Sequence, residues 1–172
     1  MIILETDRLT LREIDPSVDT EFILELLNSS GFIKYIGDRG VRTLDQSKDF
    51  IETRFRKSYA DHGYGLYAVD LKAAETPIGI CGFVNRDGLP DADLGFALLP
   101  QFEKQGYAFE SAAAVMQYGR NVLGLGRVLA ITSIDNAASG RLLEKLGFTF
   151  DGPIALPHSD EQLKLFSSAP AV

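Results

Sequence analysis

The sequence predicts a mixed α/β domain in which helices cover both faces of a mostly antiparallel sheet. Apolar residues alternate with a period of two in several short segments, and three of these follow one another through turn residues in mid-chain. In other segments the apolar period becomes helical, and helices that pack on such a sheet form layers with it. A chain of 172 residues suits one domain, which we expect to span residues 1–172.

The first part of the chain predicts a strand and two helices. Residues 9–14 alternate as a strand does, and a helix is predicted over residues 15–27. A second helix is predicted over residues 43–59, because Thr43-Leu44-Asp45-Gln46 is a capping signature. Residues 28–42, which are rich in glycine and aromatic side chains, are predicted to form a loop.

A meander of strands follows, and the chain then alternates between helices and strands. Turn residues at 86–90 separate the last two strands of the meander, and Gly147 is the expected cap of the last helix. The meander strands are predicted at residues 64–71, 77–85 and 93–99. The later helices are predicted at residues 106–122 and 137–146, and the later strands at 127–134, 148–150 and 162–166.

The composition argues against several classes of protein. The formal net charge of −7 is unlike that of a typical nucleic-acid-binding protein. Charges interrupt the apolar start of the chain, and no apolar run approaches the ~20 residues of a spanning helix, so neither a signal peptide nor a membrane partner is expected. The single cysteine, Cys81, excludes an internal disulfide, fits a cytoplasmic protein and lies in a core-like apolar run. His62 and His158 belong to no metal-binding motif, so no metal is expected.

The first chemical signal lies at residues 98–110, where a predicted strand meets a predicted helix. Backbone N–H groups at a helix start have no partner within the helix, and they carry the positive end of its dipole. Gly106 would let a phosphate approach the backbone closely, and Lys104 adds a cation. An acidic protein could hold a polyanion in this way. From these residues alone, a glycine that only shapes the helix entry explains the pattern equally well.

A second signal lies at residues 131–148, which read as a strand, a polar elbow and a helix. Asn136 and Ser139 stand three residues apart at the predicted helix entry. Side chains of this kind cap helix starts by accepting backbone N–H groups. Capping and contact with a ligand both fit this spacing.

The two segments contain motifs at a characteristic separation, namely Gln105-Gly106-Tyr107-Ala108, Asn136-x-x-Ser139 and Glu144-Lys145-Leu146-Gly147-Phe148. Together they resemble the GNAT superfamily of acetyl-CoA-dependent N-acetyltransferases. Two further motifs, Thr6-Asp7-Arg8-Leu9-x-Leu11-Arg12 and Asp93-Leu94-Gly95-Phe96, resemble the subgroup that acetylates ribosomal-protein N-termini. The resemblance covers residues 5–152.

The resemblance implies that acetyl-CoA is the co-substrate. Residues 105–110 would hold the pyrophosphate of coenzyme A, and the strands before and after their helix would splay around the pantetheine arm. A backbone N–H near Leu98 or Leu99 would polarise the thioester carbonyl. The residues implied for acetyl-CoA are Leu98, Leu99, Lys104, Gln105, Gly106, Tyr107, Ala108, Phe109, Glu110, Asn136 and Ser139.

The resemblance also implies the catalytic residues Ser139, Asp93 and Asn136, although the sequence departs from the family pattern. Glu103 stands where the phosphate motif usually begins with Gln or Arg. Many members carry a tyrosine near residues 142–144 to protonate the departing thiolate, but these residues are Leu-Leu-Glu here, so Ser139 is the remaining candidate acid. Asp93 matches the subgroup's glutamate and is the candidate base. The alternative bases lie in a late loop and are His158, Asp160 and Glu161.

The expected acceptor is an amine, on a small molecule or at a protein N-terminus, and residues 29–42 are expected to form part of its wall. An attacking amine must be neutral. At pH 7 a lysine of pKa ~10.4 is neutral about once in 2,500 molecules and an α-amine of pKa ~7.8 about once in seven, a difference of ~3.5 kcal/mol. A site without an obvious strong base therefore suits an N-terminal or low-pKa amine. The sequence does not predict an oligomeric state.

Two other functions fit parts of the sequence. A non-catalytic acyl-CoA-binding domain on the same fold would explain the missing tyrosine. A dinucleotide-binding oxidoreductase needs Gly-x-Gly-x-x-Gly after an early strand, whereas Gly124-Leu125-Gly126 follows a predicted helix. Acetyl transfer is the function that the sequence favours.

Overall fold

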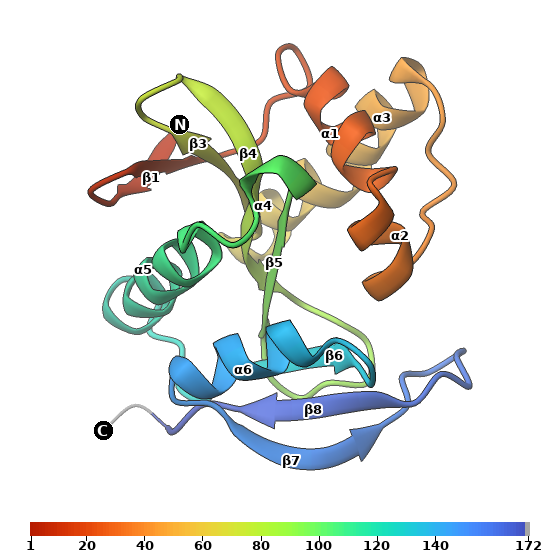
Figure 1. The fold of residues 1–172 in the computed structure, drawn as a ribbon, viewed down its shortest axis with the longest axis vertical. Coiled ribbons are helices and arrows are strands. Elements are labelled where there is room, and N and C mark those ends of the chain that lie inside the picture. The colour runs from red at the N-terminus through yellow and green to blue at the C-terminus, as the bar shows by residue number, and fades with distance from the viewer. Residues whose placement is uncertain (171–172) are drawn as a thin grey trace.

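An open sheet of eight strands is the framework of the computed structural model, which describes residues 1–170 (Figure 1). The strands are arranged in the order β1-β2-β3-β4-β5-β6-β8-β7, and every neighbouring pair is antiparallel except β5 and β6. In chain order they are β1 Ile2–Glu5, β2 Leu9–Arg12, β3 Leu66–Leu71, β4 Thr76–Val84, β5 Asp93–Leu98, β6 Leu129–Ser133, β7 Thr149–Ile154 and β8 Leu163–Ser167.

Helices cover both faces of this sheet, which confirms the predicted fold class. The first four helices pack on one face, and α5 and α6 pack on the other. Within residues 1–170, none of the helices has both the length and the apolar character that crossing a bilayer requires. The α-helices are α1 Thr20–Leu27, α2 Ser30–Tyr35, α3 Leu44–Phe50, α4 Lys57–His62, α5 Tyr107–Asn121 and α6 Ala137–Lys145, with a π-helical segment η1 Ile51–Arg56 and a 3₁₀ turn η2 Pro100–Phe102.

The alternation of side chains along the central strands separates two cores. In β3, Tyr67 and Val69 face the α5 side, whereas Ala68 faces the α1 side. A bulge in β4 adds one residue, Ile78, opposite β3 and turns its side chain toward the α5 core. Cys81 is fully buried in the same core, and burial raises the pKa of its thiol to about 12. The predicted core position of this cysteine is thereby confirmed.

The sheet divides between β5 and β6. Within residues 1–170, these two parallel strands share a single residue pair, Asp93 with Leu129, at the first residue of each strand. Beyond that pair, β5 continues along β4 and β6 continues along β8, so the two strands diverge toward their carboxyl ends (Figure 1). This is the separation that the family resemblance implied.

The helix boundaries differ from the prediction at two places. α1 begins at Thr20, not at residue 15, because the Asp15 carboxylate forms a local turn by accepting the Ser17 N–H at 2.8 Å. The helix predicted over residues 43–59 continues through η1 to His62. Its predicted cap is confirmed, since the Thr43 Oγ1 atom accepts the Gln46 N–H at 3.2 Å.

Two elements were missed by the prediction. Residues 28–42 contain the helix α2, because Phe32 is buried against the α1 core and its packing outweighs the low helix propensity of the neighbouring Gly31. The strand β1 forms an exposed edge, with 62% of Ile2 accessible. Its four residues are too few to show a clear alternation, and pairing with β2 holds them in place.

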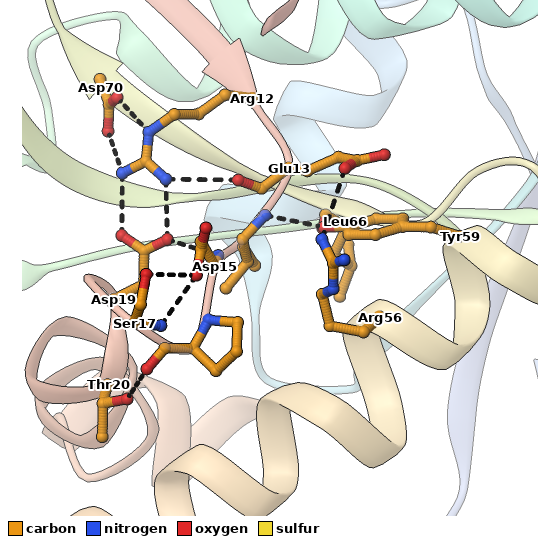
Figure 2. Close-up of polar contacts among 12 residues, drawn as sticks. Arg12, Glu13, Asp15, Ser17, Asp19, Thr20, Arg56, Tyr59, Leu66 and Asp70 are labelled. Atoms are coloured by element: carbon orange, nitrogen blue, oxygen red, sulfur yellow. Dashed lines mark hydrogen bonds and ion pairs between the residues drawn. The ribbon is translucent and has the colours of Figure 1, made fainter. Parts of the chain in front are cut away.

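A partly buried ion-pair network joins β2 and β3 to the start of α1 (Figure 2). The Arg12 guanidinium donates to both oxygens of Asp19, at 2.7 and 2.8 Å, and its Nε donates to Asp70 at 2.6 Å. Asp19 is 1% exposed and also accepts the Asp15 N–H at 2.8 Å. The hydrogen bond to Asp19 raises the pKa of Arg12. Arg12 therefore connects β2, β3 and the start of α1 through charge-assisted hydrogen bonds.

We expect Arg12→Met to lower the free energy of unfolding by about 3 kcal/mol, because it leaves the buried Asp19 carboxylate without its partner. The control is Lys57→Ala, which removes an exposed pair with Asp61 and should cost less than about 1 kcal/mol. Urea titration of both variants measures the difference. Equal losses in the two variants would contradict a structural role for the network.

Candidate functional site

The carboxyl ends of β5 and β6 bring two helix starts to the same edge of the sheet. The two strands are parallel, so both end at this edge. β5 leads through Leu99 and the turn η2 into α5, and β6 leads through a short elbow into α6. Lys145 of α6 lies over the ring of Phe109, with its Nζ 4.2 Å from the ring centroid. The last turn of α6 is thus close to the first turn of α5.

The loop that enters α5 exposes a series of backbone donors. Lys104 and Gly106 both have positive φ, at 60° and 85°. Within residues 1–170, the N–H groups of residues 104–109 donate to no other group. Successive N–H groups that converge from such a turn form an anion-binding nest, and the positive end of the α5 dipole reinforces it. The loop predicted to hold a phosphate therefore presents unpaired backbone N–H groups, the kind of donor that binds phosphates at helix starts.

Two of the side chains predicted to bind the cofactor are held by the protein itself. Tyr107 is 9% exposed and belongs to the α5 core. The Glu110 carboxylate accepts from Thr6 Oγ1 at 2.6 Å and from Arg8 Nε at 2.6 Å. Burial would raise the pKa of Glu110, but these hydrogen bonds outweigh burial and lower it. The side chains of Tyr107 and Glu110 therefore fix the start of the helix, and the Glu110 N–H donates to the Gly106 carbonyl at 3.1 Å.

The two candidate donors for the thioester carbonyl are not equivalent. The Leu99 N–H donates to the Ile78 carbonyl at 2.8 Å, so it is already satisfied within the sheet. Leu98 pairs with Gly79 in the antiparallel ladder, and successive N–H groups of a strand point in opposite directions. The N–H of Leu98 therefore points away from β4, toward the gap between β5 and β6.

The α6 entry separates the roles of Asn136 and Ser139. The Asn136 Oδ1 atom accepts the Ser139 N–H at 3.2 Å, so Asn136 is the helix cap. Ser139 is half-buried, and its hydroxyl makes no hydrogen bond within residues 1–170. This leaves the Ser139 hydroxyl available to a ligand, as its predicted role as an acid requires.

The candidate base Asp93 lies at the vertex where β5 and β6 meet. Its side chain is 1% exposed, and both carboxylate oxygens accept from Arg86 Nε, at 3.1 and 3.0 Å. Burial raises the pKa of the Asp93 carboxyl, and the Arg86 charge opposes this rise. The alternative bases lie on the exposed loop between β7 and β8 and are His158, Asp160 and Glu161.

A small cavity adjoins the same edge on the α2 side. Its volume is about 230 Å³. A Cβ atom added to Gly31 would lie 3.5 Å from Glu103 Oε1, so this carboxylate is directed toward α2. The acidic residue that departs from the family pattern thus lines the cavity. The lining residues are Ser30, Gly31, Lys34, Tyr35, Pro100 and Glu103.

Two cations near the loop were missed by the sequence analysis as functional candidates. Arg8 contacts Gln105, Tyr107 and Glu110, and Lys145 contacts Phe109. Arg8 belongs to the motif at residues 6–12, which was the available signal. Its partners are about 100 residues away in the chain, so periodicity and local spacing could not connect them.

Several known proteins resemble this chain in both sequence and fold. Residues 8–149 match the family model described as an acetyltransferase (GNAT) domain. The uncharacterized N-acetyltransferase YoaA of Bacillus subtilis (strain 168) is 32% identical over 151 residues, which cover 87% of this chain and 84% of that protein. The crystal structure of a GNAT-family acetyltransferase from Bacillus anthracis has a TM-score of 0.79 at 26% identity, covering 98% of each chain.

A relative with a named acceptor matches a shorter part of the chain. The ribosomal protein uS5-alanine N-acetyltransferase of Escherichia coli (strain K12) is 29% identical over 100 residues. The match covers 57% of this chain and 50% of that protein.

The geometry at the α6 entry predicts effects of different size on stability for substitutions at Asn136 and Ser139. Asn136→Ala should lower the free energy of unfolding by about 1 kcal/mol, because it removes the cap. Ser139→Ala should change stability by less than about 0.5 kcal/mol, because the hydroxyl has no partner within residues 1–170. Thermal unfolding measures both. A larger loss of unfolding free energy for Ser139→Ala than for Asn136→Ala would indicate that Ser139, and not Asn136, caps the helix.

Proposed function

Because this chain belongs to the acetyltransferase (GNAT) family, we propose that it transfers the acetyl group of acetyl-CoA to a low-pKa amine, above all the α-amine of a protein N-terminus. That the chain is an N-acetyltransferase follows from the family, whereas the acceptor and the residue roles are proposals. Amine attack in a complex that holds both substrates is the proposed route. The observation that carries the proposal is the run of unpaired N–H groups at residues 104–109, beside the gap between β5 and β6.

The residues around the gap fit a coenzyme A donor. The nest at residues 104–109 offers neutral donors to a pyrophosphate, and Gly106 gives the backbone the positive φ that this nest needs. Lys104 and Lys145 add positive charge at the same end. The unpaired edges of β5 and β6 can hydrogen-bond the amides of a pantetheine arm. Acetyl-CoA supplies an activated acetyl group on a thiol that leaves readily.

The proposed roles of Leu98 and Ser139 follow from their position and free hydrogen-bonding groups, whereas that of Asp93 follows from the family resemblance and the raised pKa of its carboxyl. The Leu98 N–H, directed into the gap, polarises the carbonyl that the amine attacks. Ser139, with a free hydroxyl, delivers a proton to the departing sulfur either directly or through a water that it holds. Asn136 fixes the start of α6 and so places Ser139. Asp93 is the proposed base, since burial raises the pKa of its carboxyl toward that of the amine.

The acceptor class follows from the cost of preparing a neutral amine. Asp93, the proposed base, is buried and already accepts from Arg86, so it gives limited help in deprotonating an ammonium group. An α-amine needs less help than a lysine, by ~3.5 kcal/mol. The relative from Escherichia coli, named for an alanine at a ribosomal-protein N-terminus, supports the same class. The cavity beside α2 is the proposed entry for this amine.

The proposed function predicts a distinctive pH dependence. The donor is kept saturating, and the peptide carries its N-terminus as its only amine. The value of log(kcat/KM) for this peptide should rise with pH and level off above pH ~7.8, where the α-amine becomes neutral. A peptide with a blocked N-terminus and one lysine should react far more slowly, and its rate should still be rising as the pH approaches ~10. Small-molecule amines form the third arm of this panel. Faster reaction of the lysine peptide or of a polyamine would contradict the N-terminal assignment.

Binding of the donor is tested separately from turnover. Acetyl-CoA at about 100 times its dissociation constant should stabilise the fold by ~2.7 kcal/mol, and thermal shift measures this. Stabilisation without acetyl transfer to any amine would favour the non-catalytic acyl-CoA-binding alternative. No stabilisation at millimolar acetyl-CoA would contradict both functions.

Gly106→Ala should raise the KM for acetyl-CoA about tenfold, equivalent to about 1.4 kcal/mol. The added Cβ would lie 3.2 Å from Arg8 Nη2, so the Arg8 guanidinium must move by a few tenths of an ångström, and the alanine would occupy a left-handed backbone. The matched control is Gly63→Ala, which has a similar φ of 74°, with no atom within 4 Å of the added Cβ. Both variants should lose about 1 kcal/mol of stability. If KM rises equally in both, Gly106 is only a turn residue.

A further inference from the structure

Arg8 connects the turn between β1 and β2 to the phosphate-binding loop, although these segments are far apart in the chain. Its Nε donates to Glu110 Oε2 at 2.6 Å, and its Nη1 donates to the Gln105 carbonyl oxygen at 3.1 Å. The guanidinium carbon lies 4.4 Å from the centroid of the Tyr107 ring. One planar cation therefore contacts three of the six residues from Gln105 to Glu110, and its fork geometry fixes it relative to all three.

The contact with Gln105 determines which way the neighbouring N–H group points. Residues 1–170 contain no cis peptide bond, so the Gln105 carbonyl and the Gly106 N–H point in opposite directions from one peptide plane. Arg8 holds the carbonyl oxygen on the side of the β1–β2 turn. The Gly106 N–H must then face the opposite side, within the run of unpaired donors.

This orientation needs an external constraint. Gly106 has no side chain, and glycine adopts positive and negative φ about equally well, so rotation of the 105–106 peptide is easy. After such a rotation, a carbonyl oxygen would face the pyrophosphate in place of an N–H donor. The partial negative charge of that oxygen would repel the phosphates, so one donor would be lost and one repulsion gained.

Glu110 holds Arg8 in position. Its Oε1 accepts from Thr6 Oγ1 at 2.6 Å and from the Arg8 N–H at 3.0 Å, while Oε2 accepts from Arg8 Nε. The carboxylate therefore fixes both the backbone and the side chain of Arg8. It also neutralises much of the guanidinium charge, which leaves Arg8 a weak direct attractant for an anion.

We propose that Arg8, fixed by Glu110, is a positioning residue that orients the Gln105–Gly106 peptide and so sets the affinity for the pyrophosphate of the acyl donor. The proposal rests on the proposed function, in which residues 104–109 bind that pyrophosphate. It adds a residue that acts through the loop backbone and not by its own contact with the donor.

The test compares two donors, one with and one without the pyrophosphate. Arg8→Met should raise the KM for acetyl-CoA about tenfold, as expected for loss of a charge-assisted hydrogen bond. The KM for S-acetylpantetheine, which lacks the pyrophosphate, should change less than about twofold. The control is Lys72→Met, which also releases the β1–β2 turn by removing a 2.7 Å bond to the Thr6 carbonyl but touches none of residues 104–109. It should leave both KM values unchanged.

Glu110→Gln separates positioning from direct attraction, and it tests the proposal even if Arg8→Met does not fold. If Glu110 serves to hold Arg8, the variant should bind coenzyme A several-fold more weakly by calorimetry. If Arg8 attracts the phosphates by its own charge, removing the neutralising carboxylate should tighten binding, which would overturn the proposal. An equal rise of KM for both donors in Arg8→Met would also overturn it. A wild-type protein that does not bind coenzyme A would instead contradict the proposed function.

Discussion

The arrangement of this protein depends on one contact, the meeting of β5 and β6 at Asp93 and Leu129. The Leu129 N–H donates to the Ala92 carbonyl at 2.9 Å, and salt bridges on either side, Arg86 with Asp93 and Arg127 with Asp91, hold the adjoining residues. Because the strands pair at their first residues and then follow different partners, they open toward their carboxyl ends. The gap, the unpaired strand edges and the two helix starts beside it all follow from this vertex.

The proposed site for a polyanion belongs to a protein with a net charge of −7. Arg86 and Arg8 are neutralised by Asp93 and Glu110, so neither contributes much free positive charge. The donors at residues 104–109 are neutral amides at the positive end of α5. The electrostatic field of these amide dipoles is short-range, and its direction is set by the backbone conformation. Under the proposals above, affinity at this site depends on the orientation of peptide groups more than on overall charge, and Arg8 acts by controlling one such peptide.

The sequence predicted the parts of this structure that local patterns encode. The alternation in β3 to β5, the cap at Thr43 and the polar elbow at Asn136 all depend on neighbours within a few residues. The features that the sequence did not predict depend on contacts between residues far apart in the chain. Phe32 makes α2 helical by packing on α1, and Glu110 turns toward Arg8 across the sheet. The direction of the Leu98 N–H could not be predicted either, because it depends on the register between β4 and β5. The family resemblance indicated that Leu98 and Glu110 belong to the site, but it did not predict which groups they contact.

The same vertex limits the chemistry that Asp93 can perform. The Asp93 carboxylate accepts from Arg86, which lies on the loop between β4 and β5, and these hydrogen bonds favour its charged form. Burial acts in the opposite direction and raises its pKa. A residue under both influences can assist an amine that is already partly neutral, but it is poorly suited to remove a proton from an ammonium group of pKa ~10.4. Under the proposed function, in which Asp93 is the base, this restricts the acceptor, and an N-terminal amine satisfies the restriction where a lysine does not.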